Sequence, residues 1–367
     1  MEYTIHEENE SFPYFSKVRS FFSSGNYPYV VTRVRAKRAY LLSHEVYEKL
    51  LMMDIHEITR FLGESRYKKE ITELGLTYAG FELIDLALNR NMAEVYHDIL
   101  DFSEGDLYTM LSAYLQREDI WNIKTMLRGK VYNAKPEEIM RAIRPAGKYP
   151  EQYWREVVQK SKTLEETIEN LKGNEYYDVL RTLQDEWRTN LAESENKLER
   201  AYYANLLHSV RTRSEANRLF IDFIRREIDI VNLKTLLMTK YENVEPDKIS
   251  TMILPDGEIP EKTIQLLTNA ADFTIFLEEL QKLRISETIK EHIQTIAETG
   301  SLTHMIRALE KDYLKRATRS SYLHPLSILP VLDYLIRKRI EVENLRILAR
   351  GKEKGLPDPV IREMMVM

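Results

Sequence analysis

Two glycines stand at the spacing of a phosphate-binding loop, a motif that would allow nucleotide binding. Gly75 and Gly80 are separated by four residues, as in the pattern Gly-x-x-x-x-Gly-Lys-Ser/Thr. In that motif a lysine reaches the phosphates and a hydroxyl side chain follows it. Here Phe81 and Glu82 occupy those two positions. The sequence therefore predicts no nucleotide site.

Metal binding and acid–base catalysis have no better support. The chain contains no cysteine, and none of its eight histidines belongs to a HExxH pattern or stands four residues from another histidine. Adjacent acids such as Glu165 and Glu166 diverge on a helix, so they are typical of a solvated face. No nucleophile elbow is recognisable. We expect no enzyme activity, no catalytic residue, no metal and no cofactor.

A basic cluster near the N-terminus is the sharpest local charge feature. It consists of Arg33, Arg35, Lys37 and Arg38, and on a helix Arg33 and Lys37 share one face. The cluster has two interpretations: a solvated face with intrachain ion pairs, or a docking site for an acidic partner. We take Arg33, Arg35 and Arg38 as the candidate partner-binding residues.

The elements that hold these residues are indicated by a nine-residue pattern that occurs three times. The copies span residues 122–130, 232–240 and 344–352, at steps of 110 and 112 residues. A period of this length is that of a small domain, whereas solenoids repeat every ~20 to 50 residues. The sequence therefore predicts three copies of one folding unit.

Each copy predicts an amphipathic helix, because its apolar residues recur at spacings of three and four. These residues are Ile120, Ile123, Met126 and Leu127, then Ile230, Leu233, Leu236 and Leu237, then Val342, Leu345, Leu348 and Ala349. An acidic residue precedes each copy, and we expect it to cap the N-terminus of the helix. These acids are Asp119, Asp229 and Glu341.

Two polar positions of the pattern predict packing contacts rather than ligand binding. The first is the asparagine that opens each copy, which we expect to bond to backbone or to a neighbouring helix. The second is a basic residue that we expect to form the same ion pair three times. The residues are Asn122, Asn232 and Asn344 at the first position, and Lys124, Lys234 and Arg346 at the second.

Prolines that flank a glycine mark the boundaries between units. Residues 145–150 and 255–260 share this arrangement at a separation of 110, and it stops a helix. We therefore divide the chain into helical units 1–144, 145–254 and 255–367. Longer helices are expected over residues 153–171 and 176–207, and another from Val30 to Leu51.

Composition favours an all-α fold and a chain outside the bilayer. The 367 residues include only 12 glycines and 12 prolines, and alternating β-branched stretches are nearly absent. A net charge of −5 gives no global basic field for nucleic acid. The apolar residues 325–336 are too few to span a membrane, which takes about 18 residues. Residues 1–8 lack the features of a signal peptide, so we expect a cytoplasmic protein.

Together these features strongly resemble the C subunit of archaeal-type rotary ATP synthases, a family similar to the d subunit of vacuolar ATPases. The resemblance rests on residues 29–36 (Tyr-Val-Val-Thr-Arg-Val-Arg-Ala), on the three nonamers and on the three-unit length. It covers essentially the whole chain. Departures are Ile347 and Ala349 in the third copy and Met238-Thr239 in the second.

The resemblance implies a non-catalytic, funnel-shaped spacer of the rotor, with three helical units in pseudo-threefold arrangement. Such a spacer sits on the cytoplasmic face of the membrane as a peripheral protein, one copy per complex. It links the proteolipid ring to the central axle subunits and transmits the rotation that couples proton or sodium transport to ATP synthesis or hydrolysis. No nucleic acid and no small-molecule substrate is implied.

Two other functions remain compatible with the residues. One is a soluble all-helical scaffold or regulatory interaction protein. The other is an RNA-binding protein that uses the arginine cluster, whose affinity would fall steeply with salt.

Overall fold

The computed structural model describes residues 25–210, 214–283, 290, 293, 296 and 302–366. The described residues form helices and no strand, which confirms the all-α prediction. Residues 1–8, from which we expect no signal peptide, lie outside the described part.

Three long helices carry the nonamers. They are α7 (Gly105–Val131), α14 (Glu215–Tyr241) and α20 (Leu329–Glu353). A seven-residue helix follows each one in the same order: α8 (Pro136–Ala142), α15 (Pro246–Met252) and α21 (Asp358–Met364). The nonamer therefore lies in the C-terminal half of its helix, and a shorter helix closes each segment.

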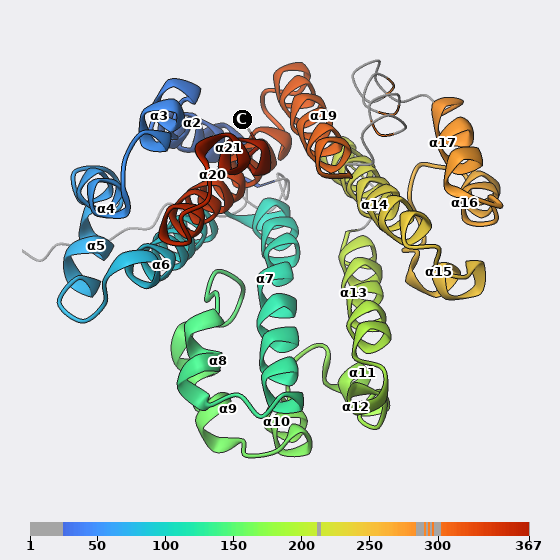
Figure 1. The fold of residues 1–367 in the computed structure, drawn as a ribbon, viewed down its shortest axis with the longest axis horizontal. Helices are drawn as coiled ribbons and strands as arrows, with labels where there is room; N and C mark the ends of the chain where they lie inside the picture. Colours follow the sequence, from blue (N-terminus) through green and yellow to red (C-terminus); the bar gives the residue numbers. More distant parts are fainter. Residues whose placement is uncertain are drawn as a thin grey trace, which may run out of the picture.

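Each nonamer helix packs against a second long helix. The pairs are α7 with α13 (Leu191–His208), α14 with α19 (Leu302–Leu323), and α20 with α6 (Gly80–Asp101). In Figure 1 the three pairs form arms that diverge from the middle of the molecule. The last pair joins the C-terminal part of the chain to its N-terminal part.

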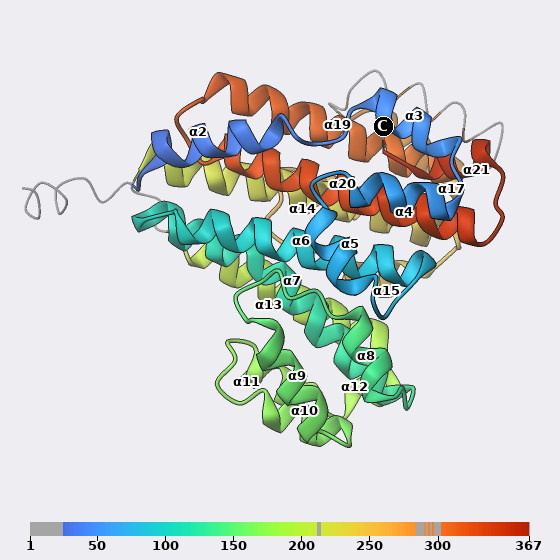
Figure 2. The same cartoon turned by 90° about the vertical axis from the view of Figure 1, so that its left-hand side faces the viewer.

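Shorter helices pack around these pairs. Before α6 come α2 (Tyr27–Arg38), α3 (His44–Leu51), α4 (Ile55–Gly63) and α5 (Lys68–Leu74). Before α13 come α9 (Glu151–Lys160), α10 (Leu164–Asn170), α11 (Tyr177–Thr182) and α12 (Glu186–Thr189). Before α19 come α16 (Glu261–Thr268) and α17 (Phe273–Gln281). Figure 2 shows α9–α12 projecting from one side of the body.

The predicted apolar stripes form the core. Eleven of the twelve stripe residues are buried, and Ile230 is half-buried. The helical spacing of three and four therefore identified the packed face of all three helices.

The predicted lengths of the three helices outside the nonamers are wrong, because each of these stretches contains more than one helix. The stretch from Val30 to Leu51 contains α2 and α3, separated by a turn. The stretch 153–171 breaks at Ser161, which has extended backbone angles, and α10 restarts where the Thr163 side chain accepts a hydrogen bond from the backbone N–H of Glu166. The stretch 176–207 is divided into α11, α12 and α13, with Asn190 capping α13. In two of the three stretches, a side-chain N-cap (Thr163 or Asn190) begins a new helix where apolar spacing alone would continue the old one.

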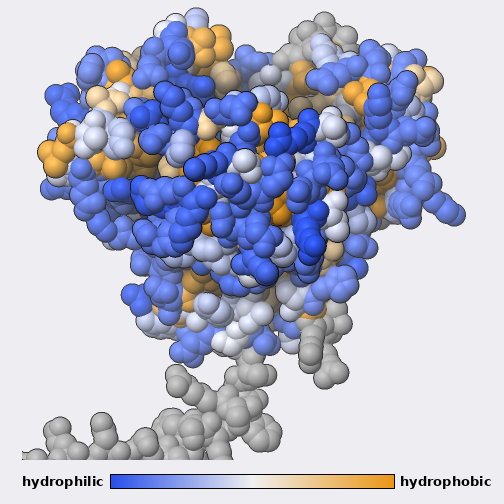
Figure 3. Space-filling view, turned by 90° about the horizontal axis from the view of Figure 1, so that it is seen from below, coloured by the Kyte–Doolittle hydropathy of each residue, from blue (hydrophilic) through white to orange (hydrophobic). Residues whose placement is uncertain are grey.

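No helix in the described ranges is both long enough and apolar enough to cross a membrane. The face seen in Figure 3 is covered mainly by hydrophilic residues, with small apolar areas between them.

Candidate interaction sites

The basic cluster lies on α2, and part of it faces inward. Arg38 donates to Asp333 of α20 at 2.8 Å, and the Asp333 side chain is only 1% exposed. Lys37 pairs with Asp98 of α6 at 2.7 Å. These two residues hold α2 against the α20–α6 pair, as the intrachain interpretation predicts.

The other two arginines of the cluster are exposed. Arg33 donates to the hydroxyl of Tyr29, and its guanidinium lies 4.8 Å from the centre of the Phe102 ring. Arg35 makes no hydrogen bond or ion pair with any residue that the structure describes. Of the three candidates, Arg33 and Arg35 present their charge to solvent, whereas Arg38 is engaged with the body.

The repeated asparagines bond to backbone, as expected. In each copy the side-chain amide donates to the carbonyl of the residue 22 positions later, and the side-chain oxygen accepts from the N–H of that same residue. The pairs are Asn122 with Arg144, Asn232 with Leu254 and Asn344 with Val366, at distances of 2.7–2.9 Å. Each asparagine therefore ties the chain segment after the short closing helix to the nonamer helix.

The acidic residue before each nonamer does not cap its own helix, so that expectation is wrong. It lies inside the helix and accepts backbone N–H groups from a later or earlier part of the chain. Asp119 accepts from Lys148 and Tyr149, Asp229 from Glu258 and Ile259, and Glu341 from Leu42. The N–H donors precede α9, α16 and α3 respectively, so each acid orients the start of another helix.

The glycines between the prolines are required by these acids. A Cβ atom on Gly147 would lie 2.3 Å from a carboxylate oxygen of Asp119, and one on Gly257 would lie 2.2 Å from a carboxylate oxygen of Asp229. Both distances are shorter than any ordinary contact. The glycines therefore allow close approach of the acid, in addition to ending a helix.

The basic position forms the same ion pair three times, which confirms that prediction. Lys124 pairs with Glu199 at 2.7 Å, Lys234 with Glu310 at 2.5 Å, and Arg346 with Asp85 at 2.6 Å. The lysine that ends each nonamer also makes the same contact in all three copies. It donates a hydrogen bond to a backbone carbonyl near the end of a short helix. These pairs are Lys130 with Ser161, Lys240 with Ala270 and Lys352 with Leu51.

The three copies thus use matching positions to reach matching elements. Contacts of the first copy run forward to residues 144–199, and those of the second run forward to residues 254–310. Contacts of the third copy run back to residues 42–85 as well as to Val366. The last segment of the chain is therefore joined to the first.

A charged cluster that was not expected from the sequence lies between the three nonamer helices. Arg117, Glu227 and Arg339 each stand five residues before a repeated asparagine. Arg117 donates to Glu227 at 2.8 Å, and both side chains are nearly buried. The repeat alignment, extended five residues toward the N-terminus, contains Arg, Glu and Arg at this position. The position is on the packed side of each helix, so the alignment could have revealed this charged cluster.

Glu227 is the carboxylate of this cluster and accepts hydrogen bonds from several side chains. Besides Arg117, it accepts hydrogen bonds from three tyrosine hydroxyls: Tyr114 at 3.3 Å, Tyr203 at 3.0 Å and Tyr313 at 2.7 Å. Burial acts to raise the pKa of Glu227, but the charges of Arg117 and Arg339 and these hydrogen bonds outweigh burial and lower the pKa to about 2. The carboxylate is therefore ionised at neutral pH and links α7, α13, α14 and α19.

A cavity of about 450 Å³ adjoins the cluster. It is lined by residues of all three nonamer helices, including Trp121, Val231 and Glu343, which stand one position before the repeated asparagines. Arg339 lines it and is only partly buried. The same face of each repeat thus borders one central space.

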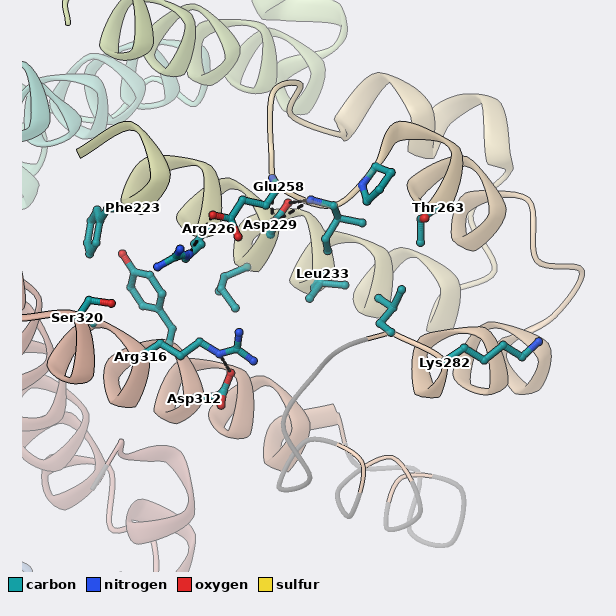
Figure 4. A pocket seen from close by; sticks show the side chains of 16 residues that line it. Phe223, Arg226, Asp229, Leu233, Glu258, Thr263, Lys282, Asp312, Arg316 and Ser320 are labelled. Carbon is teal, nitrogen blue, oxygen red and sulfur yellow. Dashed lines mark hydrogen bonds and ion pairs between the residues drawn. The ribbon is translucent and has the colours of Figure 1, made fainter. Parts of the chain in front are cut away.

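A second cavity of about 590 Å³ lies between α14, α17 and α19 (Figure 4). Its arginines are already paired: Arg226 with Glu258 at 3.0 Å, and Arg316 with Asp312 at 2.6 Å. Asp229 is occupied by backbone N–H groups. We find no arrangement for chemistry in it.

Comparison with known proteins agrees with the repeat pattern. A model of the family described as ATP synthase (C/AC39) subunit matches residues 30–364. The chain belongs to the C/AC39 family of ATP synthase subunits.

Three curated relatives show the same coverage, and each is named as the C subunit of an A-type ATP synthase. The protein of Methanosarcina acetivorans is 40% identical over 345 residues, 94% of each chain. That of Methanococcoides burtonii is 40% identical over 354 residues, 96% of this chain and 97% of its own. That of Archaeoglobus fulgidus is 34% identical over 340 residues, 92% and 96% of the two chains.

In this C/AC39 family member, the glycines at phosphate-loop spacing stand at two helix ends: Gly75 is the C-cap of α5, and Gly80 is the first residue of α6. The backbone N–H of Phe81 donates to a carboxylate oxygen of Glu353 at 3.2 Å. A side chain of α20 therefore takes the place where a helix N-terminus would hold an anion. Within the described ranges, no group of three or more histidines and acids is arranged to hold a metal ion.

The two buried aspartates predict a pH dependence of stability. Burial raises the pKa of Asp119 to about 7 and of Asp229 to about 6, against the lowering effect of the backbone N–H donors. A raised folded-state pKa means that the folded chain binds more protons, so the free energy of unfolding should fall as pH rises from about 4 to about 7. The two pKa values lie about three and two units above the ordinary Asp value, so the fall is at most about 7 kcal/mol at about 1.4 kcal/mol per pKa unit.

Urea unfolding between pH 4.5 and 8 measures this slope. The variant Asp119→Asn/Asp229→Asn should flatten it, whereas Asp247→Asn, at an exposed aspartate, should leave it unchanged. An equal slope in the double variant and the native chain would contradict the assignment.

Proposed function

We propose that this C/AC39 family member is a non-catalytic spacer in the central stalk of a rotary ATP synthase. One copy links the membrane proteolipid ring to the central axle subunits on the cytoplasmic face and is held at the membrane through the complex. It transmits the rotation that couples proton or sodium transport to ATP synthesis or hydrolysis. Its three helical units, 1–144, 145–254 and 255–367, form a funnel with pseudo-threefold symmetry.

The observation that carries this proposal is the recurrence of the contacts from one unit to the next. Lys124, Lys234 and Arg346 each pair with an acid on the long helix of another unit, and the third contact returns to the first unit. Repeated head-to-tail contacts that return to the start produce a closed ring rather than an open row. A ring of three units leaves a space on its axis in which a partner can be seated.

Torque transmission requires a body that does not shear between its units. Every junction between units combines an ion pair, a lysine–carbonyl hydrogen bond and packed long helices. The central ion pair of Arg117 and Glu227 adds a link between the first two units. These contacts favour a stiff element over a flexible regulator.

Affinity purification of the tagged chain from detergent-solubilised membranes tests the proposal. We expect the proteolipid ring and the axle subunits to be recovered with the tagged chain and to be identified by mass. Recovery of the chain alone, or with soluble proteins only, would favour the alternative function of a soluble helical scaffold.

We propose Arg33, Arg35 and Arg38 as partner contacts, with the exposed pair carrying the effect. The variant Arg33→Glu/Arg35→Glu should weaken recovery of the ring or the axle by about tenfold, because two exposed charges are reversed without loss of an ion pair with a described residue. The variant Arg38→Glu should instead lower the melting temperature, because Asp333 is buried beside it. Unchanged recovery with the Arg33/Arg35 double variant would remove α2 from the docking surface. Circular dichroism provides the folding control.

A further inference from the structure

A cavity of about 240 Å³ lies between α2, α5, α6 and α20, and it shares no described lining residue with the cavity beside Glu227. Solvent reaches it, because Tyr40 and Arg66 line it and are exposed. Sites for drug-sized ligands measure about 300–1,000 Å³, so this cavity suits a smaller molecule. We propose that it binds a small zwitterion of about the size of an amino acid. The ammonium group of the ligand meets Glu70 and Asn91, and its acidic group meets Arg66.

Two buried oxygen atoms in the cavity wall have no hydrogen-bond partner among the described residues. They are Oε2 of Glu70 and Oδ1 of Asn91, and these residues are 3% and 8% exposed. The Asn91 amide donates to Oε1 of Glu70 at 3.0 Å and to the carbonyl of Arg66 at 3.2 Å. A flipped amide would place its oxygen against these two acceptors, so the atom left over is an acceptor. Leaving both oxygens without a donor is costly, so a ligand that brings N–H groups to them is stabilising.

The charges that line the cavity leave one acid and one base unpaired. Four basic and four acidic side chains are present. Three ion pairs account for six of them: Lys37 with Asp98 at 2.7 Å, Lys69 with Glu94 at 2.9 Å, and Lys338 with Glu341 at 2.9 Å. Glu70 and Arg66 remain, and neither is in an ion pair with a described residue. A ligand that carries one positive and one negative group would match both.

Arg66 is positioned by an aromatic ring and not by an acid. Its guanidinium lies 3.5 Å from the centre of the Tyr40 ring, and it makes no hydrogen bond with any residue of the described ranges. A stacked guanidinium keeps its N–H donors available, and a carboxylate can accept two of them side by side. Because Arg66 is exposed and Glu70 is buried, the acidic end of the ligand faces outward and the ammonium end faces inward.

A divalent metal ion or a water molecule fits the two oxygens less well. Ca²⁺ takes about six to eight oxygen ligands, whereas the acceptors available here are one carboxylate oxygen and one amide oxygen. A water molecule would donate to both oxygens but would leave Glu70 without an ion-pair partner. An ammonium group supplies three donors and a positive charge together.

Calorimetric titration of the full-length chain tests the site with glycine, β-alanine and γ-aminobutyrate, which are zwitterions of increasing length. Ethylammonium and acetate probe the two ends separately. We expect one zwitterion to bind at least about tenfold more tightly than ethylammonium or acetate, because it alone meets both charges. The proposal is overturned if none of the three zwitterions binds more tightly than these two ions.

Two variants assign the contacts. Glu70→Gln removes the inner charge and should weaken the binding of the zwitterion and of ethylammonium by about tenfold to a hundredfold. Arg66→Gln should weaken the binding of the zwitterion by about tenfold and leave that of ethylammonium unchanged. Because Arg66 is exposed, its variant tests the site even if Glu70→Gln does not fold.

The matched control is Glu73→Gln, at an exposed glutamate of the same helix α5, which should change the affinity less than about twofold. Melting curves without ligand verify that each variant is folded. Equal affinities of the native chain, Glu70→Gln and Arg66→Gln would show that the zwitterion binds elsewhere and would overturn the assignment. The titrations use the isolated chain, so either result leaves the spacer function unaffected.

Discussion

Replacing Glu227 by alanine is expected to lower the free energy of unfolding by about 3–5 kcal/mol, the cost of breaking a buried ion pair by removing one partner. The variant leaves Arg117 without its carboxylate and places it near the positive charge of Arg339. It also removes the acceptor of three tyrosine hydroxyls. Because α7, α13, α14 and α19 all contribute to this cluster, we expect the unfolding transition of these four helices to shift to lower denaturant concentration.

Denaturant unfolding followed by circular dichroism measures this effect. The control is Glu258→Ala, which breaks the exposed pair with Arg226 and should cost less than about 1 kcal/mol. Glu227→Gln keeps the shape and an acceptor, so its cost should fall between the two. A loss below about 1 kcal/mol in Glu227→Ala would mean that the buried pair is not a link between units.

Replacing Gly147 or Gly257 by alanine is expected to cost about 2–4 kcal/mol, through overpacking and the loss of buried hydrogen bonds. The added Cβ would lie within 2.3 Å of an acid oxygen, so the carboxylate must move away from the N–H groups that it accepts. Gly63→Ala is the matched control, because its nearest neighbour atom lies 3.5 Å away. That variant should be neutral or slightly stabilising.

A double-mutant cycle identifies the cause. If the clash is with the carboxylate, Gly147→Ala/Asp119→Ala should cost at least about 1 kcal/mol less than the sum of the single variants. Additive losses would show instead that the glycine is needed for its backbone conformation and not for the space beside the carboxylate.

These two predictions concern residues that the sequence displayed but did not explain. Gly147 and Gly257 were visible as connector glycines, and Asp119 and Asp229 as acids at a repeated position. That they meet, 28 residues apart in each case, depends on the path of the chain around the short closing helix. Spacing along one helix contains no information on that path.

The all-α class, the three nonamer helices, their buried faces and the family could all be predicted from the order of the residues. These properties follow from a period of three to four residues and from repetition, both of which are local and can be counted. The asparagine–backbone bonds and the threefold ion pair were predictable as well, since a repeated packing position keeps its role.

The ends of the shorter helices, the helix that each acid orients, and the meeting of Arg117, Glu227 and Arg339 became visible in the folded chain alone. Caps at Thr163 and Asn190 fix two of the helix starts locally. The last two features depend on contacts between residues up to about 300 positions apart. Such contacts are set by how whole helices pack against one another, and no pattern within a single helix encodes them.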